Sequence, residues 1–211
     1  MTKITVLGAT GFAGSSIAKE AASRGHEVTV VSRSAADLAG TRAVQGSVLD
    51  SAVLADALDG AEVVVGSLSP RGDMAGQVRG AYAKVAEQLA GADARLIIVG
   101  GFGSMLAEDG SRIADGPGFP DAFKAEAQEL FSVLEALRAG EGVRWTYVSP
   151  AADFGSYIPD QTRRGEYRKG GDVPFFDADG KSAISGADFA IGVVDEIEAA
   201  AHVGEHISFA Y

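Results

Sequence analysis

Apolar residues follow two alternating patterns along most of the chain. Short continuous runs of β-branched and aliphatic residues, such as residues 95–99, are typical of strands buried on both faces of a sheet. Between these runs, apolar residues recur every three or four positions, as in Val78, Tyr82, Val85 and Leu89, which is typical of one buried helix face. The alternation predicts βαβ units, in which helices connect parallel strands.

The predicted elements extend over nearly the whole chain. Strands are expected at residues 4–7, 27–31, 41–45, 61–65, 95–99, 145–148 and 206–210. Helices are expected at residues 12–24, 51–58, 78–89, 120–139 and 189–200. The length of 211 residues and the lack of a Pro- or Ser-rich linker predict a single domain over residues 1–211.

Two segments break the alternation. Between residues 153 and 185, aromatic residues and a strong turn signal at residues 177–180 predict a small C-terminal cap on the main sheet. The loop at residues 106–119 is rich in Gly, Asp and Pro, and it is predicted to be either a mobile flap over a site or disordered surface.

The first strand leads into a glycine-rich turn at residues 8–14 (GATGFAG). Gly8 suits the tight turn after the strand, Gly11 allows the backbone to approach a phosphate, and Gly14 allows close packing of the helix on the sheet. The helix that begins near Phe12 presents unpaired backbone N–H groups and its positive dipole end to an anion, and Thr10 adds a hydroxyl donor. The strand, turn and helix together predict a site for a dinucleotide pyrophosphate.

The end of the second strand bears on which dinucleotide binds. A conventional NAD site has a carboxylate there, about twenty residues after the glycines, which binds the ribose hydroxyls. This chain has Ser32 and Arg33 instead. Because serine and arginine can bind a 2′-phosphate that a carboxylate would repel, the sequence favours NADP over NAD. The alternative is that Arg33 is only a solvated loop residue.

Further candidate cofactor contacts follow other strands, because dinucleotides lie over the carboxyl ends of parallel strands. Asp50 has two compatible interpretations: it is a good N-cap for the helix at residues 51–58, and its carboxylate could accept a hydrogen bond from an adenine amino group. The remaining candidates are Phe12, Ala13, Gly66, Ser67, Leu68, Gly100, Gly101, Pro150 and Ala151.

Composition and charge narrow the range of partners. The chain has 29 acidic and 18 basic residues, a net charge of −11, with no block of Lys and Arg, which argues against nucleic acid or an anionic membrane as a partner.

The absence of cysteine excludes disulfides, thiolate catalysis and cysteine metal sites, and it fits a reducing cytoplasm. His26, His202 and His206 show no ligand-like grouping, so no metal is expected. Apolar stretches such as residues 96–107 are too short to span a bilayer, and no signal-peptide pattern is found.

Five features of the sequence are the glycine turn, Arg33, residues 99–101, residues 149–151 and the segment 180–188. Taken together, these features resemble the atypical short-chain dehydrogenase/reductase group, in particular its NmrA-like NAD(P)H-binding and flavin-reductase-like branches. The resemblance implies an α/β doubly wound parallel sheet, the Rossmann fold, with NADP across the strand ends. It implies adenine near Asp50 and the pyrophosphate over residues 8–14. The nicotinamide is then expected near Gly100, Gly101, Pro150 and Ala151.

One departure from this group concerns its chemistry. Typical members use Tyr-x-x-x-Lys, in which the lysine lowers the pKa of the tyrosine so that the phenol exchanges a proton with a carbonyl or hydroxyl substrate. No tyrosine of this chain is followed by a lysine four positions later, and Phe123 stands in the helix where such a tyrosine is expected. Ser104 resembles the family serine only by following the fifth strand, and it is the one catalytic candidate.

Two functions are compatible with these features. The first is an NADPH-dependent reductase of flavins, quinones or similar rings, which need mainly a hydride delivered to a ring stacked on the nicotinamide. Phe102, Phe154 and Tyr157 are candidates for the pocket of such a ring, although aromatic residues are more often simply core. The second is a non-catalytic NADP-binding regulator or interaction protein, as in the NmrA-like branch. The sequence leaves the acceptor and the oligomeric state open.

Overall fold

The computed structural model of the protein describes residues 1–34 and 38–211, and in these the chain forms one mostly parallel sheet of eight strands. The strands are β1 (Lys3–Leu7), β2 (Glu27–Ser32), β3 (Thr41–Gln45), β4 (Val63–Gly66), β5 (Arg95–Val99), β6 (Arg144–Pro150), β7 (Arg168–Gly170) and β8 (Glu205–Ala210). Their order across the sheet is β3-β2-β1-β4-β5-β6-β8-β7. The order therefore reverses between β1 and β4, and in sheets of this kind ligands bind beyond the carboxyl ends of the strands at that reversal.

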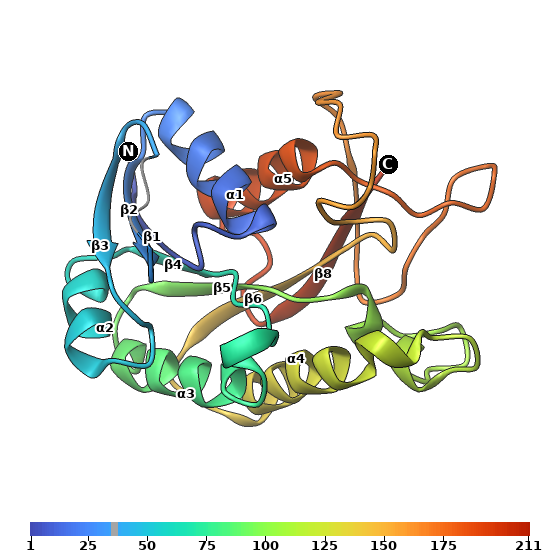
Figure 1. Ribbon diagram of the computed structural model, residues 1–211, viewed down its shortest axis with the longest axis horizontal. Helices are drawn as coiled ribbons and strands as arrows, with labels where there is room; N and C mark the ends of the chain where they lie inside the picture. The colour runs from blue at the N-terminus through green and yellow to red at the C-terminus, as the bar shows by residue number, and fades with distance from the viewer. Residues whose placement is uncertain (35–37) are drawn as a thin grey trace.

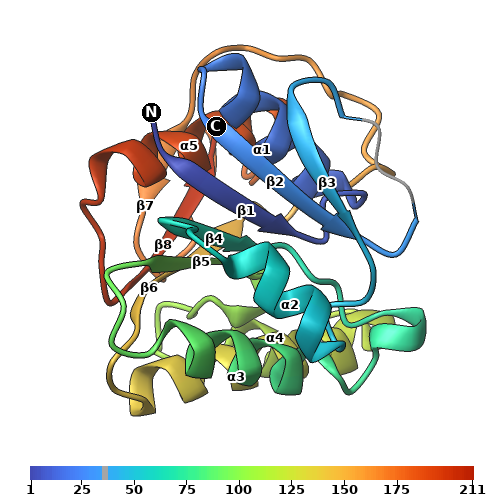
Figure 2. The same cartoon turned by 90° about the vertical axis from the view of Figure 1, so that its left-hand side faces the viewer.

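The described residues also form five α-helices in two layers. They are α1 (Phe12–Ser23), α2 (Ser51–Leu58), α3 (Val78–Leu89), α4 (Asp121–Ala139) and α5 (Gly186–Ala199). Figure 1 shows α1 and α5 on one face of the sheet and α2, α3 and α4 on the other, and Figure 2 shows the same layers from the side. Each helix layer packs against one face of the sheet and buries an apolar cluster there. One cluster contains Ile17 and Phe189, and the other contains Tyr82 and Leu134. The doubly wound α/β fold is confirmed.

Local sequence signals account for several helix boundaries. Asp50 caps α2, because its carboxylate accepts hydrogen bonds from the backbone N–H groups of Ala52 and Val53, at 2.8 and 3.4 Å. Ser185 caps α5 by accepting from the backbone N–H of Asp188 at 3.1 Å. The predicted capping role of Asp50 is confirmed. None of the helices in the described part of the chain is long and apolar enough to cross a membrane.

Strand β7 was not expected from the sequence. Its three residues, Arg-Lys-Gly, are polar and show no alternation, yet they pair antiparallel with β8 at the edge of the sheet. The pairing depends on the neighbouring strand rather than on the strand propensity of β7 itself.

The segment 153–185 contains β7 and is attached to α5 by a buried carboxylate. Asp188 has no exposed surface, and its carboxylate accepts from the backbone N–H groups of Arg164 and Gly165, at 2.8 and 2.9 Å, and from the Tyr211 hydroxyl at 2.6 Å. Burial alone would raise the pKa of Asp188, but these hydrogen bonds hold the pKa below its usual value. The predicted turn is present, since the backbone N–H of Asp177 donates to the Lys181 carbonyl at 2.8 Å.

The loop at residues 106–119 has defined local structure. Leu106 forms a bridge with Arg112, and residues Ile113–Asp115 form a 3-10 helix in which Ala114 is buried. The backbone N–H of Leu106 donates to the Asp172 carbonyl at 2.8 Å, which ties the loop to the segment 153–185. This loop is therefore a folded part of the wall described below, and the prediction of disordered surface is not supported.

Candidate functional site

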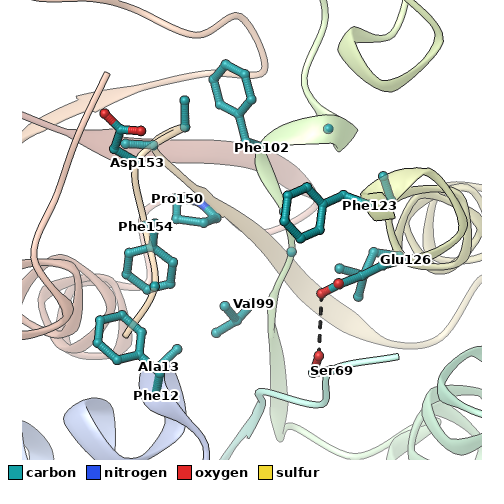
Figure 3. A pocket seen from close by; sticks show the side chains of 18 of the residues that line it. Phe12, Ala13, Ser69, Val99, Phe102, Phe123, Glu126, Pro150, Asp153 and Phe154 are labelled. Atoms are coloured by element: carbon teal, nitrogen blue, oxygen red, sulfur yellow. Dashed lines mark hydrogen bonds between the residues drawn. The ribbon is translucent and has the colours of Figure 1, made fainter. Parts of the chain in front are cut away.

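A cavity of about 710 Å³ lies beyond the carboxyl ends of the central strands. Val99 at the end of β5 and Pro150 at the end of β6 line it, together with the first residues of α1. Figure 3 shows Phe12 and Phe154 on one side of this cavity and Phe123 and Glu126 of α4 on the other. The cavity therefore lies beside the position at which the order of strands reverses.

The glycine turn is packed too tightly to accept larger side chains. Gly8 has φ +81°, and a Cβ atom added to it would lie 2.4 Å from the carbonyl oxygen of Ser67 at the end of β4. A Cβ atom on Gly14 would lie 2.4 Å from the carbonyl oxygen of Gly8. These two glycines thus bring α1 against the turn and the turn against β4, as expected for a phosphate-binding turn.

The start of α1 fits the phosphates of a dinucleotide. Its N-cap residue is Gly11, no side chain in the described residues caps the helix, and its first turn contains no acidic residue. The first backbone N–H groups and the positive end of the helix dipole are thus available to an anion. Gly11, Phe12 and Ala13 all line the cavity, so the anion site and the cavity are continuous.

The structure brings most of the predicted cofactor and pocket residues to this cavity. Those that line it are Gly11, Phe12, Ala13, Ser67, Leu68, Gly100, Gly101, Phe102, Pro150, Ala151, Phe154 and Tyr157. Predicted site residues outside the lining are Gly8, Thr10, Gly14, Ser32, Arg33, Asp50, Gly66 and Ser104. Gly8 and Gly14 shape the turn, whereas Ser32, Arg33 and Asp50 belong to the part of the predicted site that would hold the adenosine.

Arg33 lies on the surface in an ion pair. Its guanidinium Nη1 is 3.0 Å from the carboxylate Oδ2 of Asp73, and 63 % of its side-chain surface is exposed. Ser32 is buried, and its hydroxyl donates to the carbonyl of Ser34 at 2.6 Å. Arg33 is therefore accessible to a ligand phosphate, but a phosphate would compete with Asp73 for the guanidinium.

Two glycines at the ends of β4 and β5 make room for tyrosine rings. A Cβ atom on Gly66 would lie 2.3 Å from the ring of Tyr82, and one on Gly100 would lie 2.1 Å from the ring of Tyr147. The Tyr82 hydroxyl also accepts from the backbone N–H of Leu68 at 3.0 Å. Packing alone therefore requires glycine at Gly66, where the sequence suggested space for a ligand.

Ser104, the catalytic candidate, is buried and does not line the cavity. It is 1 % exposed, and its hydroxyl is 3.0 Å from the hydroxyl of Tyr147, which donates to the Leu130 carbonyl at 3.1 Å. Burial raises the pKa of Tyr147, so this phenol is a poor proton source. The contacts of Ser104 support a structural role.

A second pair of buried polar residues, Ser149 and His206, lies next to Gly101, which lines the cavity. The Ser149 hydroxyl donates to the Gly101 carbonyl at 3.0 Å and lies 2.8 Å from Nε2 of His206. Burial lowers the pKa of His206 to about 4, so the imidazole is neutral near pH 7. The pair connects β8 to the cavity floor at Gly101 and contributes no charge there.

The wall of the cavity opposite α1 was not predicted from the sequence. Phe123 and Glu126 line the cavity from the start of α4, Phe119 lines it from the loop before that helix, and Arg71 lines it from the loop after β4. Arg71 Nε lies 2.5 Å from Glu126 Oε2, an ion pair between segments that are distant in sequence. Phe123 had the helical spacing of a core residue, so periodicity alone gave no signal that it faces the site.

The aromatic wall on the other side is held by ring packing. Phe154 lies between Phe12, with ring centroids 5.0 Å apart, and Phe189, with ring centroids 4.7 Å apart. Phe12 in turn packs against Gly186, where a Cβ atom would lie 2.8 Å from the ring. These contacts fix Phe12 and Phe154, and they leave the two rings where they line the cavity.

Comparisons with known proteins agree with this geometry. A family model described as NAD(P)H-binding matches residues 8–199. The uncharacterised protein YwnB of Bacillus subtilis is 33% identical over 98% of this chain and 97% of its own length. A candidate NADH-flavin reductase from Streptococcus pneumoniae is 34% identical, with a TM-score of 0.88 over 100% of this chain and 99% of that one. A short-chain dehydrogenase/reductase of Veillonella parvula in complex with NADP, at 17% identity, shares the fold with a TM-score of 0.70 over 100% of this chain and 94% of that one.

Proposed function

The chain belongs to the NAD(P)H-binding family, and from this premise we propose that it is an NADPH-dependent oxidoreductase that reduces a flavin, a quinone or a similar ring. The observation that carries the proposal is the aromatic cavity that adjoins the phosphate-binding turn. Phe12 and Phe154 form one wall, and Phe123 belongs to the opposite wall. Phe119 also lines the cavity. Aromatic walls bury a flat ring and orient it by stacking and edge contacts.

The polar groups of the lining favour a ring acceptor over a simple carbonyl. The described lining residues include no lysine and no histidine, and Tyr157 is the one tyrosine among them. Tyr157 is 63 % exposed, and no lysine follows it at the fourth position. A carbonyl substrate needs a proton donor when its alkoxide forms, whereas a flavin or quinone spreads the incoming charge over its ring and takes its proton from water.

Each part of the site has a distinct task under this proposal. The turn at residues 8–14 and the start of α1 bind the pyrophosphate through backbone N–H groups. Gly100, Gly101, Pro150 and Ala151 form the floor against which the nicotinamide would lie, and the aromatic walls hold the acceptor ring and exclude water. The bound cofactor supplies a hydride, that is two electrons and one proton equivalent, to the acceptor.

The acceptor profile tests the proposal. Riboflavin or a small quinone should accelerate NADPH oxidation above the buffer rate, with kcat/KM at least about a hundredfold above that for simple aldehydes and ketones. The loss of absorbance at the NADPH band, with and without each acceptor, gives the rates. Turnover of simple carbonyls as fast as that of quinones would contradict the expected preference for ring acceptors. If NADPH binds and no ring acceptor is reduced, an NADP-binding regulator becomes the better account.

We propose further that Arg33 selects NADPH over NADH by binding the 2′-phosphate. The support is its exposure and its place at the end of β2, where a carboxylate would favour NAD. A charge-assisted pair of this kind contributes about 1.5–3 kcal/mol, which corresponds to tenfold or more in affinity.

Replacing Arg33 should remove most of this preference. We expect NADPH to bind the unmodified protein at least about tenfold more tightly than NADH, and Arg33→Ala to bring the two affinities within about threefold. Titration calorimetry with both cofactors measures this. Arg42→Ala, which removes another exposed arginine paired with an aspartate, Asp56, is the control and should keep the preference. Equal affinities in the unmodified protein would contradict the assignment.

A further inference from the structure

We propose that the cavity selects acceptors without negative charge, so that riboflavin or an uncharged quinone is preferred to a phosphorylated flavin. This inference rests on the proposed function, because it specifies the charge of the acceptor in the same cavity. It follows from the charged groups that line the cavity. In the described residues these are one arginine, Arg71, and two carboxylates, Glu126 and Asp153.

The arginine is already neutralised by one of the carboxylates. Arg71 Nε lies 2.5 Å from Glu126 Oε2, and the Ser69 hydroxyl lies 3.4 Å from Glu126 Oε1. Figure 3 shows Ser69 and Glu126 together at one side of the cavity. A phosphate on the acceptor would have to break this pair before Arg71 could bind it, so the arginine gives little net attraction.

The second carboxylate has no such partner. Asp153 lines the cavity on the side away from Glu126, as Figure 3 shows. Its backbone is fixed, because its N–H donates to the Ser182 carbonyl at 2.8 Å and its carbonyl accepts from the Ile184 N–H at 3.3 Å. In the described residues, no ion pair or hydrogen bond engages its carboxylate oxygens. Asp153 is itself exposed, so solvent screens part of this charge, but an anionic acceptor would still meet a carboxylate that no cation neutralises.

The surroundings reinforce this local charge. The whole chain has a net charge of −11, and a bound dinucleotide would add its own phosphates beside the cavity. The aromatic walls, by contrast, favour a flat uncharged ring. Charge and shape therefore point to the same class of acceptor.

Matched pairs of ligands test the selection by charge. Riboflavin and FMN share one ring and differ by a phosphate, and 1,4-naphthoquinone and its 2-sulfonate differ by a sulfonate. Binding is measured by quenching of flavin fluorescence in the presence of saturating NADP⁺, which cannot reduce the flavin, and kcat/KM is measured for all four with NADPH. We expect the uncharged member of each pair to be favoured by about tenfold or more.

Three variants that each remove one carboxylate identify the groups responsible. Asp153→Asn should reduce the preference for riboflavin about threefold, and Glu126→Gln should reduce it further because it also frees Arg71. The control is Glu135→Gln, which also removes one negative charge. Glu135 lies on α4, its side chain is exposed, and it does not line the cavity, so this variant should leave the preference unchanged. Added salt should reduce the preference of the unmodified protein, because it screens the repulsion.

The outcomes separate this inference from the proposed function. If FMN binds and reacts as well as riboflavin or better, selection by charge is overturned, and the reductase proposal stands. If all three variants change the ratio equally, the carboxylates of the lining do not carry the selection, because the net charge of the chain alone would explain it, and the inference is again overturned while the reductase proposal stands. If neither the flavins nor the quinones bind or react, both the inference and the proposed function are overturned.

Discussion

Gly11→Val is expected to weaken NAD(P)H binding by at least about a hundredfold, which corresponds to about 2.7 kcal/mol. Gly11 is the N-cap of α1, its backbone is extended at φ −74°, and it lines the cavity beside the free N–H groups of the helix. A β-branched side chain there would occupy the space of the pyrophosphate and cover those donors.

The fold should survive this change better than a change at Gly8 or Gly14. A Cβ atom on Gly11 would lie 3.3 Å from the Gly8 carbonyl oxygen, a close contact that a small shift relieves, whereas those on Gly8 and Gly14 would lie 2.4 Å from backbone oxygens. Cofactor fluorescence titration and a melting curve are measured together. Gly80→Val is the control, because it makes the same change in α3 with open space around it. A variant that melts normally and still binds NADPH tightly would show that the phosphate turn is misassigned.

Gly101→Leu is expected to lower turnover with ring acceptors by at least about a hundredfold, with a much smaller effect on stability. Gly101 lines the cavity, its backbone is extended at φ −134°, and an added Cβ atom would meet only Leu130, at 3.5 Å, an ordinary contact. A leucine side chain can therefore enter the cavity without backbone strain, and it would fill space that the nicotinamide and the acceptor ring need.

The phosphate turn is untouched by this substitution, so cofactor affinity should fall less than turnover. Steady-state rates, cofactor titration and thermal melting are compared. Gly171→Leu is the control, since Gly171 also has open space around it and lies outside the cavity lining. Turnover that is unchanged in Gly101→Leu would place the reaction elsewhere on the molecule.

The central sheet could be predicted because its signals are local. Residues 95–99 form an uninterrupted apolar run and become β5, and the spacing of Gly8, Gly11 and Gly14 after β1 marks the phosphate turn. Each of these signals lies within a dozen residues, where periodicity and glycine spacing are reliable guides.

The second wall of the cavity could not be predicted in the same way. Phe123 has the spacing of a buried stripe residue, yet it is 39 % exposed and lines the cavity, because it lies in the first turn of α4, where the helix begins beside the cavity. The Arg71 and Glu126 pair joins residues 55 positions apart, so no local pattern reveals it. At Gly66 the structure adds a packing reason that no local pattern reveals, because the ring of Tyr82 leaves no space for a side chain there. Its contact with a cofactor stays a prediction.

The most direct test of the account is a single-turnover experiment without oxygen. Protein, NADPH and riboflavin are mixed in equal amounts, and the NADPH and oxidised-flavin absorbance bands are followed together. Oxygen is excluded because it reoxidises reduced flavin. The account predicts that one riboflavin is reduced for each NADPH oxidised, at a rate that rises with protein concentration. Binding of NADPH with no loss of either band above the buffer rate would contradict it.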